Sequence, residues 1–369
     1  MRLGIDVSPL ARNRAGIGNY IAELLAAMVR SAPHHQYFLY TAADLPEDRL
    51  PGIGESSSVH ISRCHPLLMK WRAARDRLDL FHGMNFRLRG WGRRGGVVTI
   101  YDLALDRLAL PSRKLLGQRW SFLRTKRTAR RATKVVTISE HSAGDISELY
   151  GVPRERIAIV TPAVGPGFYR EDAPNLVRAI KLRYGIGEGE FLLSGGGSEP
   201  RKNIARLVEA FGLLPSRRDL RLVVVGGMAR GSEAIFEAVH RAGLGAAVLF
   251  PGHVPLPDLR VLYSACVAFV FPSLYEGFGM PVLEAIACGA PVISSNAASL
   301  PEVTGEAALL IDPLDVSALA GAMARVRDDR QLRDHLRQAG PIRAKAFSWD
   351  QSARDQLRVY QELVPDRVD

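Results

Sequence analysis

A short segment in the second half of the sequence holds two carboxylates among glycines. It reads SLYEGFGMPVLEAIACGAPVISS, from Ser273 to Ser295, and it contains Glu276 and Glu284. The apolar stretches on either side, ACVAFVFPS and APVIS, are typical of strands buried on both faces of a parallel sheet. Pro281 suits the first turn of a helix between them, and Gly289 suits its end. We therefore predict a strand, a glycine-rich loop, a short helix and a second strand.

In this arrangement both carboxylates are expected to face one crevice. Glu276 falls in the loop at the carboxyl end of the first strand, where open α/β sheets bind ligands, and Glu284 in the first turn of the helix. Gly277 and Gly279 would let a ligand approach the backbone. The alternative is that Glu284 only complements the helix dipole and that Glu276 is a solvated loop residue.

A second glycine-rich loop is followed by two cations. In SGGGSEPRKNIARLVEAF a strand runs into three glycines ending at Gly197, and a helix is expected to start close to Asn203. Arg201 and Lys202 then sit at the positive end of that helix, where each costs roughly 0.3 to 1 kcal/mol unless an anion binds. The pattern predicts a diphosphate site, with a mobile surface loop as the alternative. Because the sequence has no D-x-D pair, we expect no metal there.

The bulk composition favours a large protein that stays inside the cell. A chain of 369 residues with 47% hydrophobic residues can bury two domains. It has no apolar run of the ~18 residues that a membrane span requires, and MRLGIDVSPL begins directly with a strand rather than a signal peptide. The three cysteines lack zinc spacing, so we expect reduced thiols and a cytoplasmic protein.

The net charge of +11 is concentrated in one place. From Ser112 to Lys134 the sequence has nine Lys or Arg and no acid, with Leu116, Trp120 and Leu123 at helical spacing. This stretch, 112–134, could lie on an anionic membrane surface, which would make the protein peripheral at the inner face of the cell membrane. An acidic substrate, or a solvated helix with its apolar stripe in the core, are alternatives. We expect no nucleic acid, because no nucleic-acid-binding motif accompanies the charge.

Strand and helix patterns alternate along both halves of the chain. The first series contains RLGIDVS, QYFLYTA, LDLFHG, GGVVTIYD and KVVTISE, and the second EFLLSGGG, LRLVVVGG, AAVLFPGHV, CVAFVFPS, APVISS and AALLIDP. Such alternation predicts an α/β fold of two Rossmann-like, doubly wound domains facing a central cleft. We expect one domain over 1–170, a second over 171–348 and a C-terminal segment, 349–369.

Taken together, these motifs resemble a known family. The glycine-rich strand end with Arg-Lys-Asn, and PSLYEGFGMPVLEAIACGAPVI with its E-x7-E spacing, look like the retaining GT-B glycosyltransferases of family 4. The resemblance extends to GIGNY, DLFHG, VVTISEHSAGDI, GVPRERI and FSWDQSA, and so covers nearly the whole chain. It implies a hexosyltransferase with a nucleoside-diphosphate sugar as co-substrate and no other cofactor. It also implies that the domain over 1–170 binds the acceptor, that the domain over 171–348 binds the nucleotide sugar, and that a C-terminal helix, 349–369, crosses back to the first domain.

The resemblance also implies roles for individual residues. Arg201 and Lys202 would hold the donor diphosphate, Glu284 the ribose hydroxyls, and Glu276 the transferred sugar. The other donor-binding candidates are loop residues at matching positions: Gly16, Gly18, Gly197, His253, Val254, Gly277, Phe278, Gly279 and Met280. Catalytic candidates are Glu276, Asp102, Arg201 and Lys202, and candidates for acceptor binding are Tyr101, His82 and Asn85.

One position departs from the family pattern. Many relatives have His-Asp where this chain reads TIYDLA, so that Tyr101 stands in place of an imidazole while Asp102 remains. For the mechanism, Glu276 and Glu284 are assigned to binding, so neither is free for the double displacement that a pair of carboxylates performs in retaining hydrolases. We therefore expect a front-face reaction, in which Arg201, Lys202 and the helix dipole stabilise the leaving diphosphate.

The donor and acceptor are inferred from resemblance alone. SPLARNRAGIGNY is similar to bacterial mannosyl- and rhamnosyltransferases of surface polysaccharide assembly, which implies GDP-mannose and a glycan or lipid-linked saccharide acceptor. Two alternatives stay open: a sugar-nucleotide-binding protein without turnover, and an NAD-dependent oxidoreductase. The oxidoreductase is disfavoured because GGGSEPRKN and GGMARG lack the G-x-G-x-x-G spacing.

Overall fold

The computed structural model divides into two compact units. The first comprises residues 1–162 with 347–369, and the second residues 163–346. The structure describes residues 1–11, 16–46, 49–50, 53, 56–108, 115–215, 219–228 and 232–365, and within 115–119 the backbone only. The division at residue 162 comes slightly before the expected boundary at residue 170.

The first unit is built on a parallel sheet of seven strands among the described residues, in the order β3-β2-β1-β4-β5-β6-β7. Its strands are β1 (Arg2–Asp6), β2 (Gln36–Thr41), β3 (Val59–Arg63), β4 (Leu80–Gly83), β5 (Gly96–Thr99), β6 (Lys134–Thr137) and β7 (Ile157–Ile159). The central strands β1, β4 and β5 are almost wholly buried, as a parallel sheet covered on both faces requires.

Helices connect the strands of the first unit. They are α1 (Ile17–Ser31), α2 (Met69–Arg75), α3 (Ala104–Arg107), α4 (Leu115–Arg131), α5 (Glu140–Tyr150) and α14 (Trp349–Leu363), with short 3-10 turns η1 (Ser8–Ala11) and η3 (Arg154–Arg156). Helix α5 begins where the Ser139 hydroxyl accepts from the Ser142 N–H, and it ends at Gly151 in the left-handed conformation.

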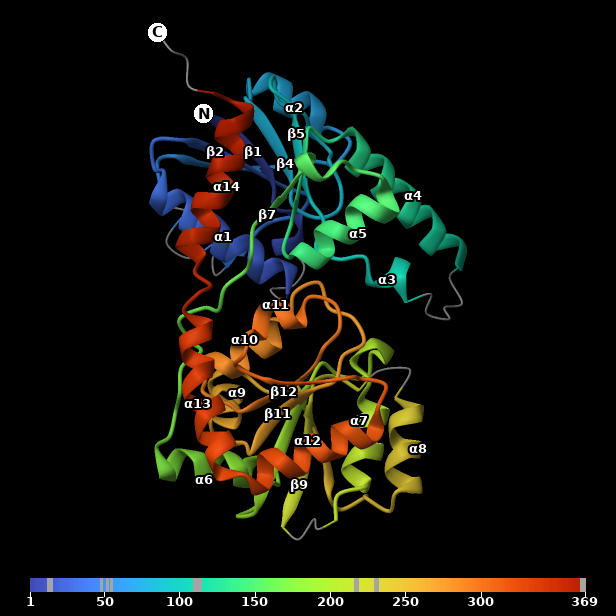
Figure 1. Cartoon of the computed structure of the whole chain (residues 1–369). Helices are drawn as coiled ribbons and strands as arrows, with labels where there is room; N and C mark the ends of the chain where they lie inside the picture. Colours follow the sequence, from blue (N-terminus) through green and yellow to red (C-terminus); the bar gives the residue numbers. More distant parts are fainter. Residues whose placement is uncertain are drawn as a thin grey trace. The chain divides into compact units, whose positions relative to one another are not determined.

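The C-terminal helix α14 belongs to the first unit. It packs beside α1, as the red and blue helices of Figure 1 show. At its far end the Tyr360 hydroxyl lies 2.6 Å from Nδ1 of His82 on β4, and near its start the Ser352 hydroxyl donates to the Thr161 carbonyl. The last helix of the chain therefore completes the fold that the first half begins.

The second unit has a parallel sheet of six strands among its described residues, in the order β10-β9-β8-β11-β12-β13. The strands are β8 (Glu190–Gly195), β9 (Leu220–Val225), β10 (Val248–Gly252), β11 (Ala268–Phe271), β12 (Val292–Ser295) and β13 (Leu309–Ile311). The helices are α6 (Pro174–Arg183), α7 (Ile204–Gly212), α8 (Glu233–Arg241), α9 (Leu256–Ala265), α10 (Met280–Ala287), α11 (Leu300–Thr304), α12 (Val316–Asp328) and α13 (Arg330–Ala344), with the 3-10 turn η4 (Pro200–Lys202).

Apolar spacing explains how these helices attach to the sheet. In α7 the buried residues Ile204, Leu207, Val208 and Phe211 recur at the interval of one helix face. They join a core cluster with buried residues of β8, β9 and β11. The prediction of an α/β fold with two doubly wound parallel sheets is thus confirmed.

Each sheet has one point at which the strand order reverses. In the first unit it lies between β1 and β4, and in the second between β8 and β11. Loops at the carboxyl ends of the two strands diverge there, which opens space for a ligand. The residues that follow β8 and β11 are those in which sequence analysis placed the donor site.

Candidate active site

The second unit brings Arg201, Lys202 and Glu276 together at its strand-order reversal. Lys202 and Arg201 follow β8, and Glu276 follows β11. Lys202 Nζ lies 2.7 Å from Glu276 Oε1, and Arg201 Nη1 lies 2.6 Å from Oε2. The expected anion in front of the two cations is therefore supplied, in the free protein, by the protein's own carboxylate.

Burial makes this cluster electrostatically strong. The side chains of Lys202 and Glu276 are only 8% and 9% exposed, whereas that of Arg201 is 21% exposed and also pairs with the exposed Glu199. Burial alone would raise the pKa of Glu276, but Lys202 and Arg201 outweigh it and hold the pKa below its ordinary value. Glu276 is therefore a buried, ionised carboxylate, and the alternative that it is a solvated loop residue is wrong.

Serine hydroxyls fix the loop that carries Glu276. The Ser273 hydroxyl lies 2.7 Å from Glu276 Oε1, and the Ser299 hydroxyl lies 2.9 Å from the backbone oxygens of both Glu276 and Phe278. Ser295 Oγ in turn donates to the Ser273 carbonyl. These serines were not predicted, because isolated serines in a sequence give no indication of the loop they will contact.

Asn203 is a further residue whose role becomes visible only in the structure. It adopts the left-handed conformation at the start of α7, which asparagine tolerates better than most residues. Its buried amide nitrogen donates to the carbonyls of Pro272 and Pro313. It thus ties the segment that carries Arg201 and Lys202 to the ends of two other strands.

Two glycines are required by the shape of the loops. A Cβ at Gly197 would lie 2.4 Å from the Gly227 carbonyl oxygen, and one at Gly279 would lie 2.5 Å from the Leu300 side chain. Both also have positive φ angles, 67° and 113°. The glycines therefore allow close packing of backbone around the cluster, which agrees with their predicted place at a ligand site.

Glu284 lies on α10 beside Tyr263 of α9. The Tyr263 hydroxyl donates to a Glu284 carboxylate oxygen over 3.4 Å. Burial raises the pKa of Glu284 to about 8, so that at neutral pH the free protein holds this group largely as the neutral acid. Because α10 begins at Met280, Glu284 falls in its second turn, and the prediction that it lies in the first turn is wrong. The helix dipole acts mainly on the first turn, so it has little effect on Glu284.

The remaining donor-binding candidates of the second unit line the same edge of the sheet. Exposed His253 and buried Val254 follow β10. Gly277 and Phe278 are buried in the loop after β11, and Met280 opens α10. All of these lie in loops at carboxyl ends of strands. Gly277, Phe278 and Met280 follow β11, as Glu276 does, whereas β9 separates β10, which His253 and Val254 follow, from β8 in the strand order.

In the first unit the predicted candidates differ in accessibility. Gly16, with φ of 49°, precedes α1, and Gly18 is buried in its first turn. Asn85 is exposed after β4, and Asp102 is half-buried after β5, where it accepts from the Ala104 N–H.

His82 and Tyr101 are buried and already hydrogen-bonded. His82 is 1% exposed, with Nδ1 beside the Tyr360 hydroxyl and Nε2 beside the Thr99 hydroxyl, and burial lowers its pKa to about 3. Tyr101 donates to the Met84 carbonyl over 2.7 Å. In this arrangement both side chains support the fold around the edge of the sheet and present no free polar atom to an acceptor.

The basic stretch forms α4, with residues 112–114 lying outside the described part of the chain. Trp120 and Leu123 are 67% and 56% exposed, so the apolar stripe does not enter the core at these positions. Lys126 and Arg130 turn back to the C-terminal carbonyls of α5, on Leu149 and Tyr150. Arg124, Arg127 and Arg131 remain on the surface.

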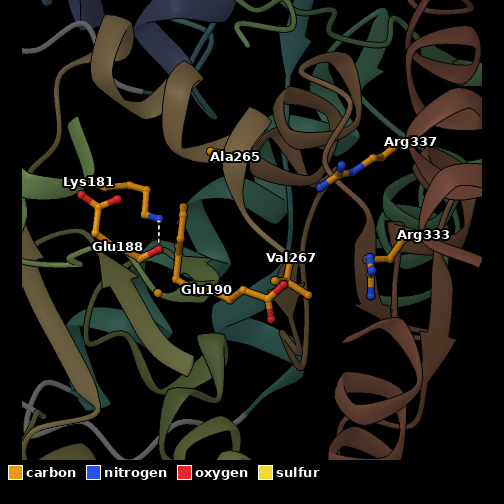
Figure 2. Close-up of a pocket in the computed structure, with 9 residues that line it drawn as sticks. Lys181, Glu188, Glu190, Ala265, Val267, Arg333 and Arg337 are labelled. Carbon is orange, nitrogen blue, oxygen red and sulfur yellow. Dashed lines mark hydrogen bonds between the residues drawn. The ribbon is translucent and has the colours of Figure 1, made fainter. Parts of the chain in front are cut away.

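A pocket of about 250 Å³ lies at the opposite edge of the second sheet. Figure 2 shows Lys181, Glu188 and Glu190 on one side and Arg333 and Arg337 of α13 on the other. It adjoins the amino ends of β8 and β11, away from the candidate active site.

Among the described residues there is no cluster of metal-binding side chains, and no helix is long and apolar enough to cross a bilayer.

Comparisons with known families match both units. The family described as Glycosyl transferases group 1 matches residues 180–343, and Glycosyltransferase Family 4 matches residues 14–167. The chain is 29% identical to O-antigen chain mannosyltransferase B of Escherichia coli, over 98% of this chain and all of that protein.

Solved structures agree in fold. Sucrose-phosphate synthase from Thermosynechococcus elongatus superposes with a TM-score of 0.77 at 23% identity, covering 99% of each chain. The Anabaena protein HepE, solved in complex with UDP and glucose, superposes with a TM-score of 0.75 at 17% identity, covering 98% of this chain and 99% of HepE.

Proposed function

Because the chain belongs to the glycosyltransferases of group 1 and family 4, with the GT-B fold, we propose that it moves mannose from GDP-mannose to a glycan or lipid-linked saccharide. That it is a transferase using a nucleotide sugar follows from the family, and the oxidoreductase and binding-only alternatives are set aside. The mannosyltransferase relative supports the choice of sugar. The observation that carries the proposal is the cluster of Arg201, Lys202 and Glu276 at the carboxyl edge of the second sheet.

In this proposal Arg201 and Lys202 bind the donor diphosphate. Lysine has three N–H donors and arginine five, so both can keep their hydrogen bonds to Glu276 and also donate to a phosphate oxygen. Glu276 acts as the positioning residue that holds the two cations at one place. Asn203 and Ser273 hold the segments on which these three residues lie.

The environment of Glu276 supports a front-face reaction with retention of configuration. One of its oxygens accepts from Lys202 and Ser273, and the other from Arg201. A carboxylate committed to these donors is a poor nucleophile towards the anomeric carbon. The leaving diphosphate would instead be stabilised by the two cations, and its oxygen would take the proton of the acceptor hydroxyl.

Glu284 is proposed to bind the ribose. Its ionised form accepts hydrogen bonds from both ribose hydroxyls, whereas its neutral form has lost part of this capacity. A pKa of about 8 in the free protein implies that nucleotide binding releases a proton near neutral pH.

The surface of α4 supports attachment to an anionic membrane at the cytoplasmic face. Trp120 and Leu123 are exposed apolar side chains, and Arg124 and Arg127 lie close to them in sequence. Exposed aromatic and aliphatic residues beside cations suit the boundary between lipid headgroups and acyl chains. A lipid-linked acceptor would then share one surface with the enzyme.

A panel of ligands tests the donor assignment. The melting temperature should rise with GDP-mannose and GDP, less with UDP-glucose and UDP, and not with NAD, because a ligand that binds only the folded state stabilises it. If only UDP-sugars stabilise the protein, the proposal of a glycosyltransferase stands but the proposal that GDP-mannose is the donor is wrong. Stabilisation by no nucleotide sugar would reject the proposed donor site.

A further inference from the structure

The pocket at the amino edge of the second sheet is a cavity that the proposed reaction does not use. Its volume of about 250 Å³ is below the roughly 300 to 1,000 Å³ of pockets for drug-sized ligands. Residues of α6, α9 and α13 and of the segments that lead into β8 and β11 line it, and its charged residues are Lys181, Glu188, Glu190, Arg333 and Arg337. A cavity of this size, lined by charges of both signs, suits a small hydrophilic molecule.

Arg333 and Arg337 form one side of the pocket. They are four residues apart on α13, which places them on one face of the helix, and Figure 2 shows both side chains extending toward the other lining residues. Neither guanidinium has a carboxylate partner in the described part of the chain. Like charges at this spacing repel each other, and an anion bound between them would recover that free energy.

The two guanidinium groups keep N–H groups for a ligand. Arg337 Nη2 donates to the Cys266 carbonyl over 3.3 Å, while its Nε is buried and has no hydrogen-bond partner among the described residues. Arg333 donates through Nη1 to carbonyls at the end of α12, one of them that of Val326 over 3.0 Å. A buried N–H group without a partner costs free energy. The Arg337 side chain therefore gains hydrogen bonds if it turns toward an anion in the pocket.

The opposite side of the pocket suits hydroxyl groups. Lys181 Nζ donates to the Glu188 carbonyl over 2.9 Å and retains two further N–H groups. The Glu188 carboxylate is paired with Arg178 over 2.8 Å, and Glu190 is exposed at the start of β8. Sugar hydroxyls donate to carboxylates and accept from an ammonium group, so one polyol can satisfy both kinds of side chain. A second anionic group on this side would be repelled by Glu190.

We propose that this pocket binds a small sugar phosphate, with the phosphate between Arg333 and Arg337 and the hydroxyls against Lys181 and Glu190. A phosphate offers three strong acceptor oxygens and close to two negative charges, which matches two guanidinium groups better than a carboxylate does. The site lies at the edge of the sheet opposite to Arg201, so it does not depend on the proposed donor assignment.

Calorimetric titration with mannose 6-phosphate tests the site without turnover. The wild type should bind it more tightly than either inorganic phosphate or mannose. Arg333→Ala and Arg337→Ala should each weaken the binding of mannose 6-phosphate about tenfold or more, as the loss of charge-assisted hydrogen bonds implies. Arg337→Lys should recover part of the loss, because lysine keeps the charge but not the bidentate geometry.

Glu190→Gln should change phosphate binding in the opposite direction. It should bind inorganic phosphate more tightly than the wild type, because a like charge has gone from the pocket. It should also reduce the preference for mannose 6-phosphate over inorganic phosphate, because an amide is a poorer acceptor for hydroxyls than a carboxylate. Since Glu190 is exposed, this variant should fold, and it tests the site even if loss of Arg333 or Arg337 unfolds the protein.

Arg330→Ala is the matched control, because Arg330 lies on the same helix, is 86% exposed and is not part of the pocket lining. It should bind mannose 6-phosphate as the wild type does, and so should Arg201→Ala. The proposal is overturned if the wild type does not bind mannose 6-phosphate, if Arg333→Ala and Arg337→Ala bind it like Arg330→Ala, or if Arg201→Ala abolishes the binding. Equal affinities for inorganic phosphate and mannose 6-phosphate would overturn the assignment to a sugar phosphate.

Discussion

Lys202 Nζ lies 2.7 Å from Glu276 Oε1, and both side chains are more than nine-tenths buried. The two residues come from segments that follow β8 and β11, the strands between which the sheet order reverses. Breaking a buried pair by removing one partner leaves an uncompensated charge away from water. The pair therefore links the stability of the second unit to the place where the donor is proposed to bind.

Glu276→Gln should destabilise the protein by roughly 3 kcal/mol, because buried Lys202 loses its counter-charge. Urea unfolding at pH 7 measures this. Glu199→Gln is the matched control: it removes a 61% exposed partner of the same Arg201 and should change stability by less than about 1 kcal/mol. Equal effects of the two variants would contradict the assignment.

The stabilising effect of Glu276 should depend on pH in a defined direction. Its folded-state pKa lies below the ordinary value of 4.5, so its contribution is present above that pH and is lost as the pH falls through the lower, folded-state value. The difference in unfolding free energy between the wild type and Glu276→Gln should therefore shrink below about pH 4. A difference that stays constant to lower pH would show that Glu276 is not held ionised by Lys202 and Arg201.

Arg201→Ala should weaken GDP binding about tenfold or more, the equivalent of roughly 1.5 to 3 kcal/mol for a hydrogen bond to a charged group. Calorimetric titration gives the affinity, and thermal unfolding shows that the fold survives. Arg241→Ala, which removes a guanidinium that is 61% exposed and paired with Glu209, should leave the affinity unchanged. If Arg201→Ala binds GDP normally, the diphosphate lies elsewhere.

Glu284 should make GDP binding depend on pH above neutrality. Its pKa of about 8 in the free protein means that more of it is ionised as the pH rises from 7 to 9, and the ionised form accepts from ribose hydroxyls. The affinity of the wild type should rise over this interval, and that of Glu284→Gln should stay flat. A parallel pH profile in both proteins would assign the ribose to another group.

The raised pKa of Glu284 also predicts how protein stability changes with pH. The direction is opposite to that predicted for Glu276. Because the folded state favours the neutral acid, the stability that Glu284 contributes is lost as the pH rises from about 4.5 to about 8. Glu284→Gln should therefore be more stable than the wild type at pH 8, by on the order of 1 to 3 kcal/mol. Denaturant unfolding at pH 5 and pH 8 checks whether the gain appears only at the higher pH.

Trp120→Ala with Leu123→Ala should reduce sedimentation with anionic vesicles at low salt, since both are exposed apolar residues of α4. Salt should reduce binding of the wild type through screening over ~8 to 10 Å. Leu314→Ala, which removes an apolar side chain that is 60% exposed in the second unit, is the control and should sediment like the wild type. If the wild type fails to bind any vesicle, the membrane proposal falls and the transferase remains.

The sequence predicted the second unit better than the first. All six strands named in the second series are present, because each is a short apolar run between glycine or proline signals. In the first unit β3 and β7 were not among the strands named. They are the two edge strands of the sheet. In β3 only Val59 is buried, and His60, Ile61 and Arg63 are exposed, which is why VHISR lacks an apolar run.

For the candidate site, the sequence predicted which residues gather but not how they pair. Motif spacing placed Arg201, Lys202 and Glu276 at carboxyl ends of strands, where the structure has them. Glu276 can neutralise the two cations only because β8 and β11 are neighbours in the sheet. The spacing of motifs along the sequence does not reveal which strands are neighbours. The hydrogen bonds that hold His82 and Tyr101 could not be predicted either. His82 contacts Tyr360 of α14, which is distant in sequence, and Tyr101 contacts Met84 in the loop after the neighbouring strand β4.

The most direct measurement is the transfer of labelled mannose from GDP-mannose to mannose-terminated saccharides, free and lipid-linked. The proposal predicts one GDP released for each mannose transferred, an α-mannoside product that retains the configuration of the donor, and strongly reduced rates in Arg201→Ala and Glu276→Gln but not in Arg241→Ala. A β-mannoside product would contradict the front-face reaction. If neither GDP-mannose nor any other nucleotide sugar supports transfer, or if Arg201→Ala is as active as the wild type, the active site proposed for the second unit is wrong.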